Sequence, residues 1–339
     1  MRRMASVLSI LVLVPLAAVG GCSDDNQQNT SGAAGAGGGG GGSGGQGGTG
    51  GAGGGAADLS DKFKAALFLG SCIPDDGINR WLNRFYTQKS DNPMYEYPAE
   101  LFACFKDKAN GCKAVEDCFG AKAELDPAGC MDSCNGTIST SCDDQLKFTV
   151  DCAKVGATCV AAEGGCVIEP LGPVCDPGTF KDSCQNGAPL VCMGREEKGP
   201  DCAKYGLTCG PGAFGGGAYC VGSGPMCTQD VSSPLTINYR DGIACNGAKM
   251  RACVNGFEHE IDCATLGAGF TCQAGAMGAF CGLGNECDPN EGMDATCEGT
   301  SVVVCNAGRI EKIDCKSFGF TSCNAMFGTC GPSVHDSAP

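Results

Sequence analysis

The segment Asp151-Cys152-Ala153-Lys154-Val155-Gly156 decides the fold of this chain, because its pattern returns as DCAKYG at 201–206, DCATLG at 262–267 and DCKSFG at 314–319. An aspartate caps a helical turn through its side-chain oxygen, and a glycine ends such a turn in the left-handed conformation. We therefore expect one capped turn per copy, with the apolar residue before each glycine filling a small core. Recurring carboxylates also suit calcium or a general base, but their shared place before a turn favours capping by Asp151, Asp201, Asp262 and Asp314.

The cysteines around these segments keep a common register. In each copy six cysteines occur, with seven residues between the second and third and nine between the third and fourth. This spacing predicts four tandem cysteine-rich repeats, at 130–169, 170–222, 223–283 and 284–332. We call the six cysteines of one repeat a set and number them from one to six along the chain. The four sets are Cys130, Cys134, Cys142, Cys152, Cys159, Cys166; Cys175, Cys184, Cys192, Cys202, Cys209, Cys220; Cys227, Cys245, Cys253, Cys263, Cys272, Cys281; and Cys287, Cys297, Cys305, Cys315, Cys323, Cys330.

Cysteine usage indicates the compartment. The chain has 29 cysteines, and setting Cys22 aside leaves an even 28, of which four precede the sets, at Cys72, Cys104, Cys112 and Cys118. No Cys-x-x-Cys occurs and the chain has only 2 histidines, so we expect no metal. All 28 are expected to form disulfides in an oxidising compartment. Six cysteines allow about 15 pairings, so the connectivity stays open.

Turn signals predict the secondary structure of each repeat. Asn255-Gly256 separates two apolar-containing runs and is typical of a two-residue hairpin turn, and Asn306-Ala307-Gly308 holds the matching place in the fourth repeat. Each repeat should then contain a β-hairpin, the capped turn and a short final strand. The expected fold class is small, disulfide-rich and mainly β, with an N-terminal α-helical, disulfide-linked module before the four repeats.

Residues 58–129 have the periodicity of helices. Apolar side chains recur at helical spacing there, and Trp81 belongs to such a face, which favours a core role over a ligand platform. The expected helix starts are Asp61, Asp76, Pro98 and Pro127.

The N-terminal part has the plan of an export signal followed by a spacer. Arg2 and Arg3 precede an apolar stretch that is short for a membrane span, so we expect a cleaved signal peptide at 1–21. From Gly32 to Gly55, 17 of 24 residues are glycine, so 22–57 is expected to be a flexible Gly-rich linker.

Val19-Gly20-Gly21-Cys22 resembles the lipobox of bacterial lipoproteins. The resemblance implies that Cys22 carries diacylglycerol, that the signal is cut before it, and that a further acyl chain such as palmitate is added. Ser23 rather than aspartate after the cysteine implies the outer membrane. The layout of lipobox, glycine tether and cysteine-rich repeats is similar to surface lipoproteins of the myxobacterial type.

Charge restricts the partners. Without the two signal arginines the mature chain has 21 Lys and Arg against 38 Asp and Glu, a formal charge of −17. Such a chain repels nucleic acid, so we expect the membrane, through the lipid, and an extracellular protein or glycan as partners. No cofactor is expected.

Few residues suggest catalysis. His259 is expected on an exposed strand face, and His335 in the polar tail at 333–339. The run 288–294 is similar to part of a calcium loop but lacks its closing glutamate, so we expect a turn.

These observations favour a non-enzymatic surface protein for adhesion, recognition or envelope structure. One alternative is an exported hydrolase, or its regulator, that uses carboxylates of the helical module. Its candidates are Asp75, Asp76 and either Glu96 or Glu100. A calcium- or carbohydrate-binding module is the third interpretation.

Overall fold

A computed structural model describes residues 59–73, 77–90, 97, 99–126, 129–143, 146–161, 165–167, 172–213, 216–228, 233–291 and 295–332. Cys22, the signal peptide, the Gly-rich linker, Asp75, Asp76, Glu96 and His335 lie outside the described residues. The described part is mainly β with four α-helices, and it falls within one compact unit. The disulfide-rich, mainly β class predicted from the sequence is therefore present.

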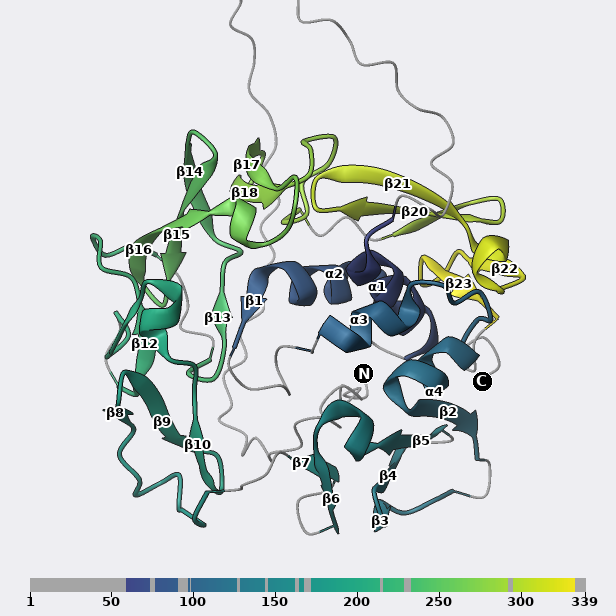
Figure 1. The fold of residues 1–339 in the computed structure, drawn as a ribbon, viewed down its shortest axis with the longest axis horizontal. Coiled ribbons are helices and arrows are strands. Elements are labelled where there is room, and N and C mark those ends of the chain that lie inside the picture. Colours follow the sequence, from purple (N-terminus) through teal and green to yellow (C-terminus); the bar gives the residue numbers. More distant parts are fainter. Residues whose placement is uncertain are drawn as a thin grey trace, which may run out of the picture. The chain divides into compact units, whose positions relative to one another are not determined.

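The four helices pack together (Figure 1) and bury most of the aromatic residues of this part of the chain. Their bounds are α1 Asp61–Cys72, α2 Gly77–Thr87, α3 Ala99–Phe105 and α4 Lys113–Phe119. Disulfides Cys72–Cys112 and Cys104–Cys118 tie the C-terminal ends of α1 and α3 to the start and the body of α4. The helices therefore hold a conventional apolar core that is also cross-linked.

Two helix starts differ from the predictions. The cap of α1 is Ser60, whose hydroxyl accepts a hydrogen bond from the Phe63 N–H at 3.2 Å, and Asp61 is the first helical residue. No helix follows Pro127 in the described residues 129–132, and the strand before it, at 121–125, belongs to a sheet. The fourth helix, α4, lies earlier: it follows Cys112 and contains Cys118.

Each cysteine set carries a short meander of strands, a 3₁₀ turn and a second hairpin (Figure 1). In the first set these are β2 Ala121–Leu125, β3 Ser133–Asn135, β4 Ile138–Asp143, β5 Leu146–Asp151, η3 Cys152–Val155, β6 Thr158–Val160 and β7 Gly165–Val167. In the second they are β8 Ser183–Gln185, β9 Ala188–Cys192, β10 Glu196–Lys198, η5 Cys202–Tyr205, β11 Thr208–Gly210 and β12 Tyr219–Val221. A second hairpin thus stands where the sequence predicted only one final strand.

The third and fourth sets follow the same order. The third has β14 Gly242–Asn246, β15 Lys249–Val254, β16 Phe257–Asp262, η6 Cys263–Thr265, β17 Thr271–Gly275 and β18 Gly278–Gly282. The fourth has β19 Thr296–Glu298, β20 Ser301–Asn306, β21 Arg309–Asp314, η7 Cys315–Phe318, β22 Ser322–Asn324 and β23 Thr329–Gly331. In the third set β14 also pairs with β18, which joins the meander and the second hairpin into one five-stranded sheet.

The hairpin turns lie where the sequence placed them. Asn255 and Gly256 have φ of 49° and 88°, the left-handed pair that matches the twist of two antiparallel strands. In the fourth set the two turn residues are Ala307 and Gly308, at φ 50° and 87°, while Asn306 ends β20. The register of both hairpins is therefore set by local backbone chemistry.

All four cysteine sets share one connectivity. Position one bonds to three, two bonds to five, and four bonds to six, which completes 14 disulfides together with the two among the helices. Positions five and six stand directly opposite each other on the second hairpin, for example Cys159 and Cys166, yet each bonds elsewhere. Because opposite residues point to the same side of a ladder, two disulfides lie beside each other there.

The bond between positions four and six is buried in all four sets. In the first set Cys152 and Cys166 are 0% and 2% exposed, and the corresponding cysteines of the other sets are also buried. Position four is also the first residue of the capped turn. The Asp151 Oδ1 accepts from the Ala153 N–H at 3.2 Å, and the other three aspartates accept from the equivalent N–H at 3.1–3.2 Å. The carboxylate, the turn and the buried disulfide thus form one local unit.

The end of the capped turn differs in the third set. Gly156, Gly206 and Gly319 have positive φ, as expected for a left-handed cap. In the third set the cap is Leu266 in the right-handed region, and the positive φ falls on Gly269 instead. The prediction for Gly267 was wrong, because the chain makes one more turn before it enters β17.

The helices are joined directly to three of the four sets. β2 pairs with β5 of the first set, and β1 Gln88–Lys89 pairs with β13 Ile237–Asn238, which leads into the third. In the fourth set the Cys330 N–H donates to the buried Ser71 hydroxyl at 3.1 Å, across 259 residues of sequence. Phe68 of α1 also contacts Phe318 and Phe320. The sheet of the first set thus begins at Ala121, before the boundary drawn at 129.

We predict that the buried disulfide of a set contributes more stability than a half-buried one. Cys152–Cys166 and Cys130–Cys142 close loops of similar length, with separations of 14 and 12 residues, so their effects on the unfolded chain are nearly equal. Replacing Cys152 and Cys166 by alanine should lower the free energy of unfolding by about 2–5 kcal/mol, and the other pair by less. Calorimetric melting of both double variants tests this, and equal losses would contradict it.

We also predict a capping contribution from Asp262. Asp262→Ala removes the acceptor for the Ala264 N–H and should lower the free energy of unfolding by about 1 kcal/mol. Asp262→Asn keeps an acceptor oxygen and should retain most of that stability. If thermal melts show the same midpoint for the alanine variant as for the unchanged protein, the carboxylate does not act as a cap.

Candidate functional site

The strongest candidate site is a cavity of about 220 Å³ beside the aromatic core of the helices. Helix α2 places Trp81 and Phe85 on its buried face, four residues apart, and α3 adds Phe102. Phe85 stands nearly perpendicular to Phe102 and to Tyr97, with centroid distances of 4.9 and 5.7 Å. These edge-to-face contacts fix the rings that form the wall.

The lining combines apolar rings with polar groups from four elements of the chain. Ala99 at the start of α3 is exposed, which leaves this side of the cavity accessible to solvent. A cavity of about 150 Å³ already holds a benzene molecule, so the volume here suits one ring and a small substituent. The lining residues are Lys62, Arg84, Phe85, Gln88, Tyr97, Ala99 and Phe102.

Two cationic side chains line this cavity. The Lys62 ammonium donates to the Phe85 carbonyl at 3.1 Å and lies 5.6 Å from the centroid of the Phe102 ring. The Arg84 guanidinium lies 4.7 Å from the centroid of Trp81. Both side chains are half-buried. Ring contacts of this kind attract a cation and help to hold its side chain in place.

Tyr86, which follows the cavity-lining residue Phe85, carries an uncharged hydroxyl group. Its ring packs on Phe270 with centroids 5.0 Å apart, and its hydroxyl is 3.1 Å from the Ser60 hydroxyl. Burial raises the pKa of Tyr86 to about 12, although the hydrogen bond with Ser60 opposes the shift. The phenol therefore stays protonated at neutral pH and adds no negative charge beside Lys62.

Trp81 is in the core, as the sequence predicted. It is fully buried against Phe85, Tyr97 and Phe119. Sequence reasoning missed the two cations. Arg84 follows Trp81 by three residues, a spacing that places both on one side of a helix, so that signal was present. Lys62 comes from another helix, and only the packing of α1 on α2 brings it near.

His259 corrects one prediction. It was expected on an exposed strand face, but it is half-buried, and its Cε1 would lie 3.4 Å from a methyl group placed on Gly206. The ring also forms a hydrogen bond with the Tyr205 backbone. The second and third sets meet here, which explains why the strand face is covered. Burial lowers the pKa of His259 below its usual value.

The predicted alternatives gain little geometric support in the described residues. Asp288 is 5% exposed, and its carboxylate accepts from the N–H groups of Met277 and Asn290 at 3.0 and 2.9 Å, so it ties a turn to the tip of the β17–β18 hairpin. Glu100 is exposed on α3, and its proposed partners lie outside the described part. In that part no three His, Cys, Asp or Glu residues group as a metal site requires.

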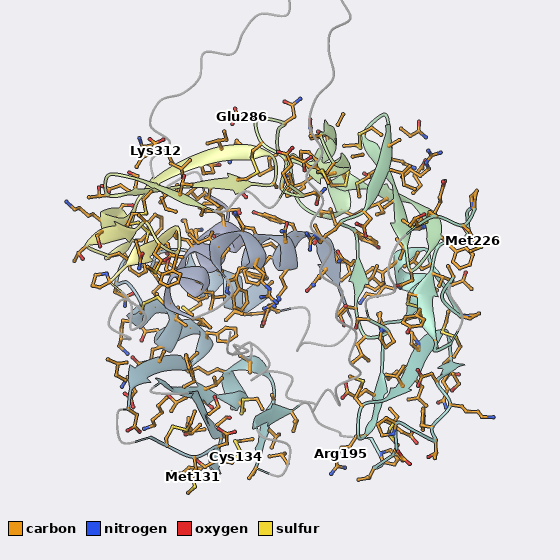
Figure 2. All side chains as sticks on the ribbon, turned by 180° about the vertical axis from the view of Figure 1, so that it is seen from behind. Met131, Cys134, Arg195, Met226, Glu286 and Lys312 are labelled. Carbon is orange, nitrogen blue, oxygen red and sulfur yellow. A yellow bond between two sulfur atoms is a disulfide. The ribbon has the colours of Figure 1, made fainter. Side chains whose placement is uncertain are left out.

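The two exposed methionines Met131 and Met226 do not form one apolar site. Figure 2 shows Met131 and Met226 pointing outward from opposite sides of the view, and they are 85% and 65% exposed. Because they lie far apart, these two side chains do not share a patch. Among the described helices, none has the length and apolar character needed to cross a membrane.

Comparisons with known proteins find no match: no family model, no curated protein and no solved structure is significantly similar to this chain.

The lowered pKa of His259 predicts a pH dependence of stability. As the pH falls, the unfolded chain takes up the proton near the usual value of 6.5, before the folded protein does, so stability is present above that pH and is lost below it. His259→Gln cannot titrate, so its melting temperature should fall less than that of the unchanged protein between about pH 7.5 and about pH 5.5. Parallel decreases for both proteins would contradict this assignment.

Proposed function

We propose that this chain is an exported, lipid-anchored bacterial surface protein whose disulfide-stapled part presents a rigid, non-enzymatic recognition surface. The observation that carries the proposal is that all 28 cysteines other than Cys22 are paired in 14 disulfides. Such bonds persist outside the reducing cytosol. A protein with this cross-linking therefore belongs to an oxidising compartment.

The anchor is Cys22. It is the one cysteine left over when the others pair, and it ends the lipobox-like Val19-Gly20-Gly21-Cys22. Diacylglycerol and a further acyl chain such as palmitate would give stable membrane attachment, since one chain alone is marginal. Ser23 favours the outer membrane, and the glycine-rich stretch would separate the folded part from the lipid.

We further propose that the four cysteine sets are tandem copies of one module after an N-terminal helical module. The identical pairing of their six cysteines supports this, as do the four capped turns. Small units of this size bury too little apolar surface to fold on that basis alone. Three disulfides per unit compensate, which allows exposed loops to vary while the frame stays rigid.

Adhesion, recognition or a structural role in the envelope fits this design best. The recurring aspartates already act as caps, and His259 is held against the Tyr205 backbone, so neither is arranged as an acid or base toward the cavity. The charge of −17 favours a partner that is not a polyanion. An extracellular protein or glycan is the expected partner class.

Intact-mass analysis of the mature protein tests the proposal. Reduction should add two hydrogens for each of the 14 disulfides, or 28 in all, and the N-terminal peptide should carry acyl mass at Cys22. Feeding cells an alkyne-bearing palmitate should label the protein, and Cys22→Ser should abolish the label. A substantial fraction of free thiols, or an unmodified Cys22, would refute the proposal.

A further inference from the structure

We propose that Asn135, Asn186 and Asn246 are sites of spontaneous covalent modification, at which the side-chain amide is lost and aspartate or isoaspartate forms. The proposal concerns the exposed turns of the cysteine sets and does not depend on the membrane anchor or on a partner. It is argued from the surroundings of each asparagine that a glycine directly follows, a pair that we call an Asn-Gly step.

The reaction needs only the chain and water. The backbone nitrogen of the following residue forms a bond to the side-chain carbonyl carbon of the asparagine. The amide nitrogen leaves as ammonia and takes the proton of the attacking nitrogen. Water then opens the cyclic imide at either of its carbonyl carbons, which gives aspartate or isoaspartate. Glycine in the following position favours the attack, because it has no Cβ to obstruct it.

The structure divides the five Asn-Gly steps of the sequence into three open steps and two closed steps. At the open steps both residues are exposed. These steps lie at the turns of the first hairpin of the first three sets, β3–β4, β8–β9 and β14–β15. The open steps are Asn135-Gly136, Asn186-Gly187 and Asn246-Gly247, and the closed steps are Asn110-Gly111 and Asn255-Gly256.

The attacking nitrogens of the open steps are accessible. Among the hydrogen bonds of the described residues, none uses the N–H of Gly136, Gly187 or Gly247. A methyl group placed on Gly136 or Gly247 would meet no atom within 4 Å, so the space around these nitrogens is open. The asparagine side chain can therefore approach the nitrogen without displacing a neighbour.

The side-chain amides of the open steps are also exposed. In the described part of the chain, no hydrogen bond holds the side chain of Asn135 or Asn186. The Asn246 amide donates to the Glu260 carboxylate at 3.0 Å, but both residues are exposed, so water competes for this bond. All three side chains can thus rotate toward the glycine nitrogen.

The step at Asn110 is closed by its glycine. Gly111 is buried, and its N–H donates to the Phe318 carbonyl at 2.8 Å. The Asn110 amide in turn donates to the Asp117 carboxylate at 3.3 Å. Attack would require the buried hydrogen bond of the nitrogen to break first, which raises the barrier.

The step at Asn255 is closed by its amide. Asn255 is 5% exposed, and its side-chain amide donates to the Cys220 carbonyl at 2.7 Å. Gly256 is buried as well. The amide is therefore fixed away from the solvent that must accept ammonia and supply water, although the dipeptide is the same as at the open steps.

Each conversion replaces a neutral amide by a carboxylate at a hairpin turn. Aspartate is ionised at neutral pH, so three conversions would change the formal charge of the mature chain from −17 to −20. In the fourth set, Glu298 already holds the place before the turn glycine Gly299. The modification would therefore give the first three sets an acidic group where the fourth has one.

The five steps of one molecule serve as controls for each other. The mature lipidated protein in detergent micelles, with its disulfides intact, is kept in mildly alkaline buffer below its melting temperature. A reduced and alkylated sample in urea is kept beside it. Samples taken over time are digested at mildly acidic pH, and mass spectrometry of the peptides gives the deamidated fraction at each asparagine. In the denatured chain all five steps should convert at similar rates, since each is Asn-Gly.

In the folded protein, the three open steps should convert at least about tenfold faster than the two closed steps, which corresponds to about 1.4 kcal/mol in the barrier. Conversion of Asn110 or Asn255 as fast as Asn135 would overturn the proposal. Rates at the open steps more than about a hundredfold below those of the denatured chain would overturn it too, because the folded turns would then be protected.

Two matched variants test the same division at the level of the whole protein. Asn135→Gln removes an open step, because glutamine cyclises far more slowly, and it should reduce the acidic species that accumulate on ion-exchange chromatography. Asn110→Gln changes an exposed asparagine of a closed step and should leave that accumulation unchanged. Thermal melts check that both variants fold. An equal reduction by the two folded variants would contradict the assignment of Asn135 as an open step.

Discussion

The disulfide between cysteine positions four and six is the constraint on which the rest of each set depends. It is buried in every set, and its first cysteine begins the 3₁₀ turn that an aspartate caps. The turn positions the cysteine, and the bond then holds the second hairpin against the turn. Each set is a small unit that buries little apolar surface. The covalent bond therefore supplies stability that hydrophobic burial gives in larger domains. The other two disulfides of a set then attach the meander to this centre.

The helices and the strands next to them connect the cysteine sets within the compact unit. The helices are cross-linked to each other by disulfides. The short strands that follow α2 and α4 pair with strands elsewhere in the chain, since β1 pairs with β13 and β2 pairs with β5. Neighbouring sets are linked as well: the Asn255 side-chain amide donates to the Cys220 carbonyl at 2.7 Å, and the Leu283 N–H donates to the Ala307 carbonyl at 2.7 Å. Hairpin turns thus receive the segment that leaves the preceding set, so the turns have a packing role in addition to reversing the chain.

The candidate site follows from this arrangement rather than from any motif. Its rings belong to α2, α3 and the segment around Tyr97, while its cations come from α1 and α2. The helical periodicity of Trp81 and Phe85 could be recognised in the sequence because both lie on one short element. The place of Lys62 could not, since it depends on how α1 packs against α2. His259 illustrates the same limit: its strand was predictable, but the cover provided by the Tyr205 and Gly206 backbone was not.

Local chemistry in the sequence by itself determined the disulfide-rich, mainly β class, the turn at Asn255-Gly256 and the capped turns after the four aspartates. Each of these depends on residues a few positions apart, so spacing and residue type are sufficient. Only the tertiary structure decided which cysteines pair, where β2 and β1 find their partners, and that two cations and three aromatic rings share one cavity. Other tertiary contacts join groups as far as 145 or 259 residues apart, as in the hydrogen bonds of Ser90 with Leu235 and of Ser71 with Cys330. Contacts at such separations are set by the packing of whole elements, which leaves no periodic signal in the sequence.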